Sequence, residues 1–244
     1  MAAPDPTGAN RSGPDPAGRN LDTSLTALAA LGEPLRRALY QFVADQDHSV
    51  SRDEAAEGLA IARSAAAFHL DRLVDDGLLE TEFRRLSGRQ GPGAGRPAKL
   101  YRRAQGDIEV SLPARRYAFA AGLLAAAVTE SAETGAPVAT VVADVARRRG
   151  AELAAAAGGD RARSPIDVLA AQGYEPHRDR GDIVLTNCPF HVLAAEHPAL
   201  VCGMNLALLD GFVGALPETG LEARLEPSEG QCCVRLGAAK EDTP

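Results

Sequence analysis

Two short helical patterns joined by a tight turn limit the folds open to the N-terminal half of this chain. Ser51, with Glu54 three residues later, forms a capping-box pattern and predicts a helix over 52–59. A turn at 60–62 leads to a second, longer helical pattern over 63–76, which carries one apolar stripe. Because an apolar stripe alone reports only burial, the pair is also compatible with a plain helical hairpin.

The residues that follow the second pattern decide between these two interpretations. Gly77 is a typical helix stop, and Leu78 begins a predicted strand. Between Phe83 and Gly106 the chain has seven basic residues, no acidic residue and a glycine-rich centre. This pattern predicts a β-hairpin with cationic arms beside the second helix, and the whole segment therefore predicts a winged helix-turn-helix. Pro34 suits a first-turn position, so a further helix is predicted over 34–45.

The distribution of charge favours double-stranded DNA as the partner of this half. The net charge of the chain is −7, but DNA contacts need only a local basic surface. Small residues at the start of the second helix would let its backbone approach the major groove, and the arginines of the hairpin would neutralise phosphates. The predicted DNA-binding residues are Ser51, Arg63, Ser64, Ala67, Phe68, His69, Arg72, Arg84, Arg85, Arg89, Arg96, Lys99 and Arg102.

Two runs of residues in this half resemble a known family. The run HLDRLVDDGLL at 69–79, followed by GRPAKLYR at 95–102, is similar to the ArsR-like winged-helix regulators, and the second run is the more diagnostic. The resemblance covers residues 21–106. It implies a homodimer that binds an inverted repeat in an operator, with one recognition helix in each major-groove half-site.

The rest of the chain predicts central helices and a small mixed domain. Alanine-rich patterns over 112–133 and 138–157 predict two helices that need an apolar partner, either a second protomer or the chain's own C-terminal domain. Later patterns predict a short helix from Pro165 to Gly173, a hairpin of 175–178 with 182–187, a helix over 198–216, and strands at 221–226 and 232–236.

The predicted fold class of the whole chain is α+β. The first twenty residues have no helical periodicity and are predicted to be a disordered tail. The predicted organisation is a tail at 1–20, a winged helix-turn-helix at 21–106, a helical linker or dimerisation segment at 107–160, and a Cys-containing sensor domain at 161–240.

All four cysteines lie in the last of these domains, at positions 188, 202, 232 and 233. In a reducing compartment such a group favours metal or redox chemistry over structural disulfides. The spacing does not match a zinc ribbon, but the ends of three separate elements each contribute a thiol, which allows thiolates to converge on a metal or cluster. Zinc binding, thiol redox sensing and buried cysteines without any ligand are the alternatives.

Cys188 with Pro189, then Cys202, then Cys232, resemble the ligand order of the SufR-type iron-sulfur regulators, which join an ArsR-like winged helix to a Cys-rich sensor domain. The resemblance implies an iron-sulfur cluster on these thiols. In that group the first interval is one residue shorter and Thr stands where this chain has Cys233, which leaves the cluster type and the fourth ligand open. The candidates for the fourth ligand are Cys233, His191 and His197.

Other classes of function lack support in the sequence. An enzyme needs a converging acid, base and nucleophile, or a phosphate-binding loop, and no such pattern is present. Residues 1–20 lack the apolar core of a secretory signal, and the apolar run 119–128 is too short for a membrane span. We therefore expect a cytoplasmic, non-enzymatic regulator that does not contact membranes. A DNA-binding or protein-interaction module without a sensor is the remaining alternative.

Overall fold

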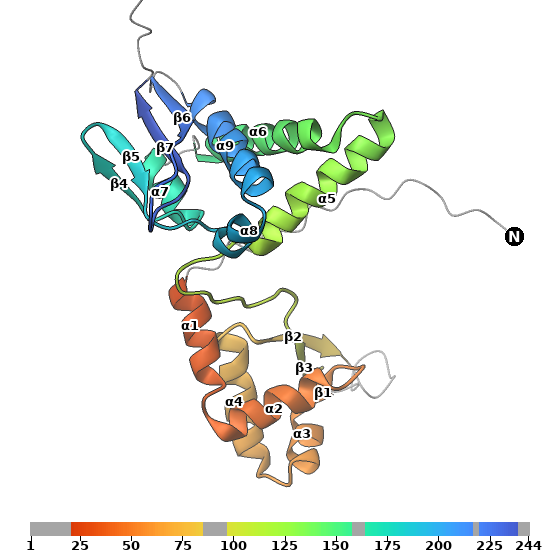
Figure 1. Ribbon diagram of the computed structural model, residues 1–244. Helices are drawn as coiled ribbons and strands as arrows, with labels where there is room; N and C mark the ends of the chain where they lie inside the picture. Colours follow the sequence, from red (N-terminus) through yellow and green to blue (C-terminus); the bar gives the residue numbers. More distant parts are fainter. Residues whose placement is uncertain (1–20, 85–96, 158–163, 217–219, 239–244) are drawn as a thin grey trace, which may run out of the picture. The chain divides into compact units, whose positions relative to one another are not determined.

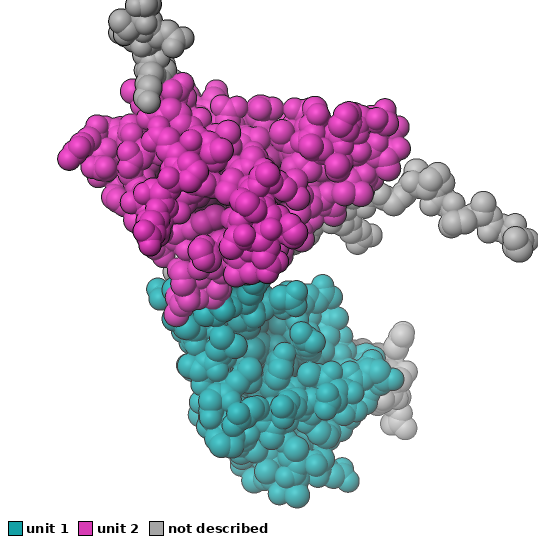
Figure 2. Space-filling model, viewed as in Figure 1, with its two compact units in different colours: residues 1–110 teal, residues 111–244 magenta. Residues whose placement is uncertain are grey.

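The computed structural model describes residues 21–84, 97–157, 164–216 and 220–238 (Figure 1). The chain divides into two compact units, Met1–Val110 and Ser111–Pro244, which are coloured separately in Figure 2. Both helices and small antiparallel sheets are present, which confirms the α+β class. No helix in the described ranges is long and apolar enough to cross a membrane. The tail at 1–20 and the predicted DNA contacts Arg85, Arg89 and Arg96 lie outside the described residues.

The first unit contains helices and one three-stranded antiparallel sheet with the order β1-β3-β2. In this sheet Thr81 of the second strand pairs with Tyr101 of the third, and Val50 of the first strand pairs with Tyr101 from the other side. The elements are α1 (Leu21–Ala30), α2 (Pro34–Ala44), β1 (Val50–Ser51), α3 (Arg52–Gly58), α4 (Arg63–Asp75), β2 (Leu79–Arg84) and β3 (Ala98–Arg103).

Local signals in the sequence set the ends of these helices. The predicted capping box is present: the Glu54 N–H donates to Ser51 Oγ, and the Ser51 N–H donates back to the Glu54 carboxylate. Gly77 follows α4 with a φ of 71°, a conformation in which glycine has no steric penalty. The two-residue strand β1 was not predicted, because it pairs with a strand some fifty residues later, Ala98–Arg103.

One apolar core holds the first unit together. Leu70 and Leu73 of α4 are fully buried, as is Tyr101 of β3, so α4 and β3 are packed on the same core. The other buried apolar residues of this core are Ala27, Ala30, Leu39, Val43, Val50, Ala55, Ala56, Ala66, Leu78 and Leu79.

The second unit packs helices on a four-stranded antiparallel sheet with the order β4-β5-β7-β6. Its elements are α5 (Tyr117–Thr134), α6 (Val138–Ala157), α7 (Pro165–Ala171), β4 (Pro176–Asp179), β5 (Asp182–Leu185), α8 (His191–Glu196), α9 (Pro198–Gly214), β6 (Leu221–Leu225) and β7 (Val234–Ala238).

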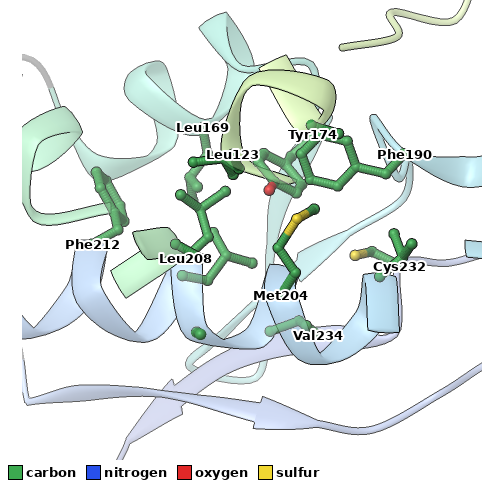
Figure 3. Packing of buried hydrophobic residues seen from close by; sticks show 14 of the residues in the cluster. Leu123, Leu169, Tyr174, Phe190, Met204, Leu208, Phe212, Cys232 and Val234 are labelled. Carbon is green, nitrogen blue, oxygen red and sulfur yellow. The ribbon is translucent and has the colours of Figure 1, made fainter. Parts of the chain in front are cut away.

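The helices α6 and α9 approach each other closely enough for their backbones to touch. A Cβ added to Gly150 would lie 1.9 Å from the Leu208 carbonyl oxygen, and one added to Gly211 would lie 2.0 Å from the Arg147 carbonyl oxygen. The apolar residues of α5 and α6 share one core with α9 and the sheet (Figure 3). The central helices therefore pack on the chain's own C-terminal elements, which was the second of the two alternatives, and segment 107–160 does not form a layer separate from 161–240.

The structure differs from the predicted elements of the second unit in three places. The helix predicted over 112–133 begins at Tyr117, because the preceding residues cross another segment: the Arg116 N–H donates to the Pro189 carbonyl. The short helix α8 was not predicted. The last strand was expected to begin at Cys232, but β7 begins at Val234, so Cys232 and Cys233 lie in the segment before it.

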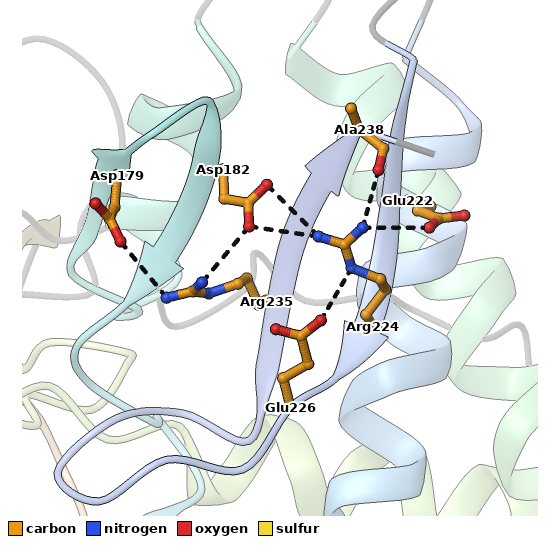
Figure 4. A network of polar contacts seen from close by, with 7 residues as sticks. All are labelled: Asp179, Asp182, Glu222, Arg224, Glu226, Arg235 and Ala238. Atoms are coloured by element: carbon orange, nitrogen blue, oxygen red, sulfur yellow. Dashed lines mark hydrogen bonds and ion pairs between the residues drawn. The ribbon is translucent and has the colours of Figure 1, made fainter. Parts of the chain in front are cut away.

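Cross-strand ion pairs connect all four strands of this sheet (Figure 4). Arg224 of β6 lies 3.4 Å from Asp182 of β5, and Arg235 of β7 contacts both Asp182 and Asp179. A Cβ on Gly237 would lie 2.2 Å from the Arg224 guanidinium, so only glycine leaves room for this network at that position.

Candidate nucleic-acid interface and cysteine site

One face of α4 carries the exposed residues that were predicted to contact DNA. Ser64, Phe68 and Arg72 are exposed and recur every four residues, so they lie on one side of the helix. Ala66 and Leu70 lie on the opposite side and are fully buried. Phe68 is 69% exposed, which is unusual for an aromatic ring in a helix that has an apolar core available to it. The exposed face of α4 is therefore available to a partner.

Arg63, the first residue of α4, is paired with Asp53 in the first turn of α3. The Arg63 Nε donates to one carboxylate oxygen of Asp53, and Nη2 donates to the other at 3.2 Å. This hydrogen-bonded pairing raises the pKa of Arg63 above its already high ordinary value, so the guanidinium is charged at any physiological pH. Both side chains are exposed, so the pair is accessible from solvent.

A second polar contact attaches the hairpin to α4. Lys99 Nζ of β3 donates to Asp71 Oδ1 at 2.6 Å, and the Tyr101 hydroxyl donates to the same oxygen at 2.7 Å. Burial by itself would raise the pKa of Asp71, but the hydrogen bonds from Lys99 and Tyr101 outweigh it and lower that pKa. Burial and the contact with Asp71 raise the pKa of Tyr101. Lys99 was predicted to contact a DNA phosphate. In the structure its ammonium group joins β3 to α4 through Asp71.

Several other predicted DNA contacts are engaged within the protein. His69 lies on the side of α4 that faces Glu33, with its Nδ1 3.7 Å from the carboxylate. The Ser51 hydroxyl accepts from the Glu54 N–H and caps α3. Other ion pairs join Arg72 to Asp76, Arg84 to Glu82, and Arg102 to Glu80. The Arg84 and Arg102 pairs are exposed and weak, so they can exchange for phosphate contacts, whereas the Asp76 side chain is only 6% exposed.

A hollow of about 470 Å³ opens between the first turns of α3 and α4 and the arms of the hairpin. Five of the lining residues were not among the predicted DNA contacts, and Arg52, Asp53 and Phe83 are three of them. The signal that could have identified them is their position: Arg52 and Asp53 start the helix that precedes the recognition helix, and Phe83 precedes the basic segment. The lining residues are Ser51, Arg52, Asp53, Arg63, Phe83, Pro97, Ala98 and Lys99.

The cysteines of the second unit differ in their exposure. Cys188 and Cys232 are buried, whereas Cys202 and Cys233 are partly exposed. The hydrogen bond between the Cys188 and Cys232 thiols, together with burial, raises the pKa of Cys188. That same bond lowers the pKa of Cys232, but its contact with Cys233 and burial outweigh this effect and raise the pKa to about 11. At neutral pH these two thiols are therefore protonated and weakly nucleophilic.

A buried polar chain leads from the core to Cys232. The Tyr174 hydroxyl donates to Asn205 Oδ1 at 2.5 Å, and the Asn205 amide donates to Cys232 Sγ at 3.2 Å. Tyr174 and Asn205 are each 1% exposed, and Figure 3 shows Tyr174 and Cys232 among the apolar side chains around Met204. Cys202 lies three residues before Asn205 on α9, so it is on the same side of that helix. Burial raises the pKa of Tyr174 well above its ordinary value.

The cysteines were predicted to form a metal or cluster site. Their chemistry suits soft metals, since they supply several thiols and Asn205 supplies a donor to one sulfur. Within the described part of the chain, however, no group of three or more His, Cys, Asp or Glu residues is placed to hold one metal ion. His191 is the first residue of α8, and His197 directly follows its last residue.

A family model described as a helix-turn-helix domain matches residues 31–82, which lie entirely in the first unit. The match supports a winged helix-turn-helix regulator of the ArsR type, and therefore a DNA-binding transcriptional regulator. Regulators of this kind are typically not enzymes. Comparison with curated proteins and with solved structures found no match.

Proposed function

We propose that this DNA-binding regulator binds an operator as a homodimer, with α4 in the major groove and the β2–β3 hairpin against the phosphate backbone. The observation that carries this proposal is the exposed face of α4, which presents Ser64, Phe68 and Arg72 to solvent beside the Arg63 guanidinium. A helix in this position with small and cationic residues at its start fits the geometry of major-groove recognition. One short helix contacts few base pairs, so selectivity in a genome favours two copies on an inverted repeat.

DNA binding is tested with the full chain and a library of random-sequence duplexes. We expect selection of a symmetric sequence, and an affinity that falls as salt concentration rises, because neutralised phosphates release counterions. Arg84→Ala, which removes an exposed cation from β2, should weaken binding to all sequences alike. Arg178→Ala, which removes an exposed cation from β4 of the second unit, is the matched control and should change nothing. If the chain neither binds duplexes at low salt nor enriches any sequence, the proposal is wrong.

The homodimer is tested separately by sedimentation. At micromolar concentration we expect a species of twice the 25.4 kDa chain mass, with or without operator DNA. A species of one chain mass under both conditions would contradict this part of the proposal and leave DNA binding to be judged by the selection experiment.

We further propose that the second unit senses iron-sulfur cluster or redox status through Cys188, Cys202, Cys232 and Cys233. The support is the number of soft thiols, their origin in three different parts of the unit, and the Asn205 amide that donates to one sulfur. A bound cluster would supply a one-electron redox centre. Because the described residues hold no ready group of three ligands, this proposal rests on the kind and number of thiols.

The contact between Cys188 and Cys232 favours a second candidate, in which this pair is oxidised to a disulfide, a reaction that the raised pKa values of both thiols make slow. The two thiols would lose two protons and two electrons to hydrogen peroxide, which is reduced to two molecules of water. In either case a change at the cysteines regulates DNA binding only if the two states of the protein differ in operator affinity. A coupling of about 5-fold to 150-fold is ordinary for such switches.

The Cys202→Ser variant distinguishes these two candidates. The full chain is isolated without oxygen, and its visible absorption, iron and zinc contents and operator affinity are measured. A cluster sensor should lose its chromophore in both Cys188→Ser and Cys202→Ser, and the difference in operator affinity should disappear with it. A disulfide sensor should keep its response to peroxide in Cys202→Ser and lose it in Cys188→Ser. If the protein contains no metal and its operator affinity does not change with peroxide, both the cluster sensor and the disulfide sensor are excluded. If it contains zinc and no iron, the zinc alternative is favoured.

A further inference from the structure

We infer that Asp53 is a positioning residue that holds the Arg63 guanidinium so that its remaining edge can recognise a guanine in the major groove. This inference rests on the proposed DNA-binding function and goes beyond it, because it assigns a base preference and a residue that imposes it. The observation that carries it is the two-point contact between Asp53 and Arg63 at the exposed junction of α3 and α4.

The donors that Asp53 uses leave others available. An arginine has five N–H groups in a planar fork. Asp53 accepts from Nε and Nη2 of Arg63, which occupies one side of the fork. Both hydrogens on Nη1 and the second hydrogen on Nη2 remain on the end of the guanidinium. A guanine presents two acceptors, O6 and N7, to the major groove, and these match the two nitrogens at the end of the fork.

The position of the pair suits this role. Arg63 is the first residue of α4, and residues at the start of a recognition helix are those that reach base edges. Asp53 is in the first turn of α3, so the contact spans the two helices of the helix-turn-helix. The side chains are 64% and 63% exposed, which leaves Arg63 accessible to a ligand while it is still held by Asp53.

Stability does not account for this contact, because exposed ion pairs contribute little to folding. Orientation does: an arginine held in one geometry before binding loses less rotamer freedom when it meets a base. The Asp53 carboxylate also repels phosphates, which weakens binding to incorrect sequences. Asp53 should therefore raise the preference for guanine and lower the affinity for random DNA.

The test repeats the selection from random-sequence duplexes with variants of the full chain. The wild type should enrich a guanine at one position of each half-site, and Arg63→Ala should lose that enrichment. Asp53→Asn should reduce the preference for guanine at that position by about 5-fold or more, within the discrimination expected of one bidentate contact, and should bind random duplexes more tightly. Asp75→Asn, which removes a carboxylate at the other end of α4, is the control and should keep the guanine preference.

A second variant separates position from charge. Asp53→Glu keeps the carboxylate but moves it by one methylene, so it should lower the guanine preference without tightening binding to random duplexes. A merely structural role would change the melting temperature and not the preference at one base position.

Three results would overturn the inference. Asp53→Asn with an unchanged guanine preference would show that Arg63 needs no positioning, and tighter binding alone would make Asp53 only a repulsive element. If Asp53→Asn lost the enrichment of a cytosine and kept that of the guanine, Asp53 would contact a base itself. Failure of the proposed function would give a different result, because the wild type itself would then enrich no sequence.

Discussion

In the first unit Asp53 and Arg63 pair at the surface, each more than 60% exposed, whereas in the second unit Tyr174 and Asn205 pair with 1% exposure each. The same contrast in exposure holds for a second polar contact in each unit. Asp71 and Lys99 pair at the partly exposed junction of α4 and β3, while Cys232 receives its hydrogen bond inside the core.

This difference in depth bears on how each unit can work. Surface contacts can exchange for a ligand at little expense in folding energy, which suits a face that meets DNA. A buried polar group without a hydrogen-bond partner lowers the stability of the fold. A change at Cys232 therefore alters the hydrogen bonds and the packing of Asn205 and Tyr174. We therefore expect substitutions at the exposed residues of the first unit to act mainly on binding, and substitutions at Tyr174 or Asn205 to act mainly on stability.

The largest effect is expected at the crossing of α6 and α9. Gly150→Ala places a methyl group 1.9 Å from a backbone oxygen that cannot move alone, so the second unit should lose stability at the upper end of the roughly 1–3 kcal/mol typical of overpacking. Gly203→Ala on α9 is the matched control, because no atom lies within 4 Å of its added Cβ. It should stabilise the unit slightly, by up to ~1 kcal/mol. Equal melting temperatures of the two variants in calorimetry would disprove the close approach.

The next effect compares the same chemical change in both units. Tyr174→Phe leaves the Asn205 oxygen buried without its donor, and should destabilise the second unit by about 1–3 kcal/mol. Tyr101→Phe removes a donor from Asp71, which keeps Lys99 and whose side chain is 48% exposed to water. Its effect should be smaller, roughly 0.5 kcal/mol. Denaturant unfolding measures the loss of stability in both variants. If Tyr101→Phe lost as much stability as Tyr174→Phe, or more, the contrast between exposed and buried polar contacts would be wrong.

A smaller effect on stability is expected at the exposed face of α4. Phe68→Ala removes a ring that is 69% exposed, so it should change stability by no more than about 0.5 kcal/mol while weakening operator binding. Val192→Ala, at an exposed apolar residue of α8, is the control and should change neither quantity. Operator affinity and melting temperature are measured for both variants. A large loss of stability in Phe68→Ala would show that the ring is part of the core.

The smallest effect is a pH dependence in the first unit. Hydrogen bonds with Asp47 and Glu54 raise the pKa of His48 above 6.5. Charged His48 therefore adds stability that is fully present below pH 6.5 and is lost as pH rises through the raised pKa. The effect should be slight, because the side chain is 48% exposed. His48→Gln should flatten this part of the pH profile of the melting temperature, and an unchanged profile would contradict it.

The helix-turn-helix was predictable because its signals are local. The capping box of Ser51 with Glu54 and the stop at Gly77 depend on residues within a few positions of each other, and both are present in the structure. The exposed face of α4 followed from the same periodicity. His69, which was predicted as part of that face, lies toward Glu33, and this position could not be deduced from the pattern of α4 alone.

The partners of these residues were not predictable in the same way. Asp53 precedes Arg63 by ten residues, and its contact depends on the angle between α3 and α4. Cys188, Cys202 and Cys232 were singled out by residue type, but the sequence contained no signal that Asn205 and Tyr174 would lead to one of them. Their contact joins residues that are 27 and 31 positions apart.

The sequence by itself determined the class of the first unit and the residues that carry its charge, because helix caps, turns and periodicity act over a few residues. Only the tertiary structure decided that α5 and α6 pack on the C-terminal elements. Only it decided that Cys188 and Cys232 lie together in that core and that Asp53 holds Arg63. These outcomes depend on how whole elements pack and how close their backbones come, as at Gly150 and Gly211, and such distances are set by the sum of many contacts between residues far apart in the chain.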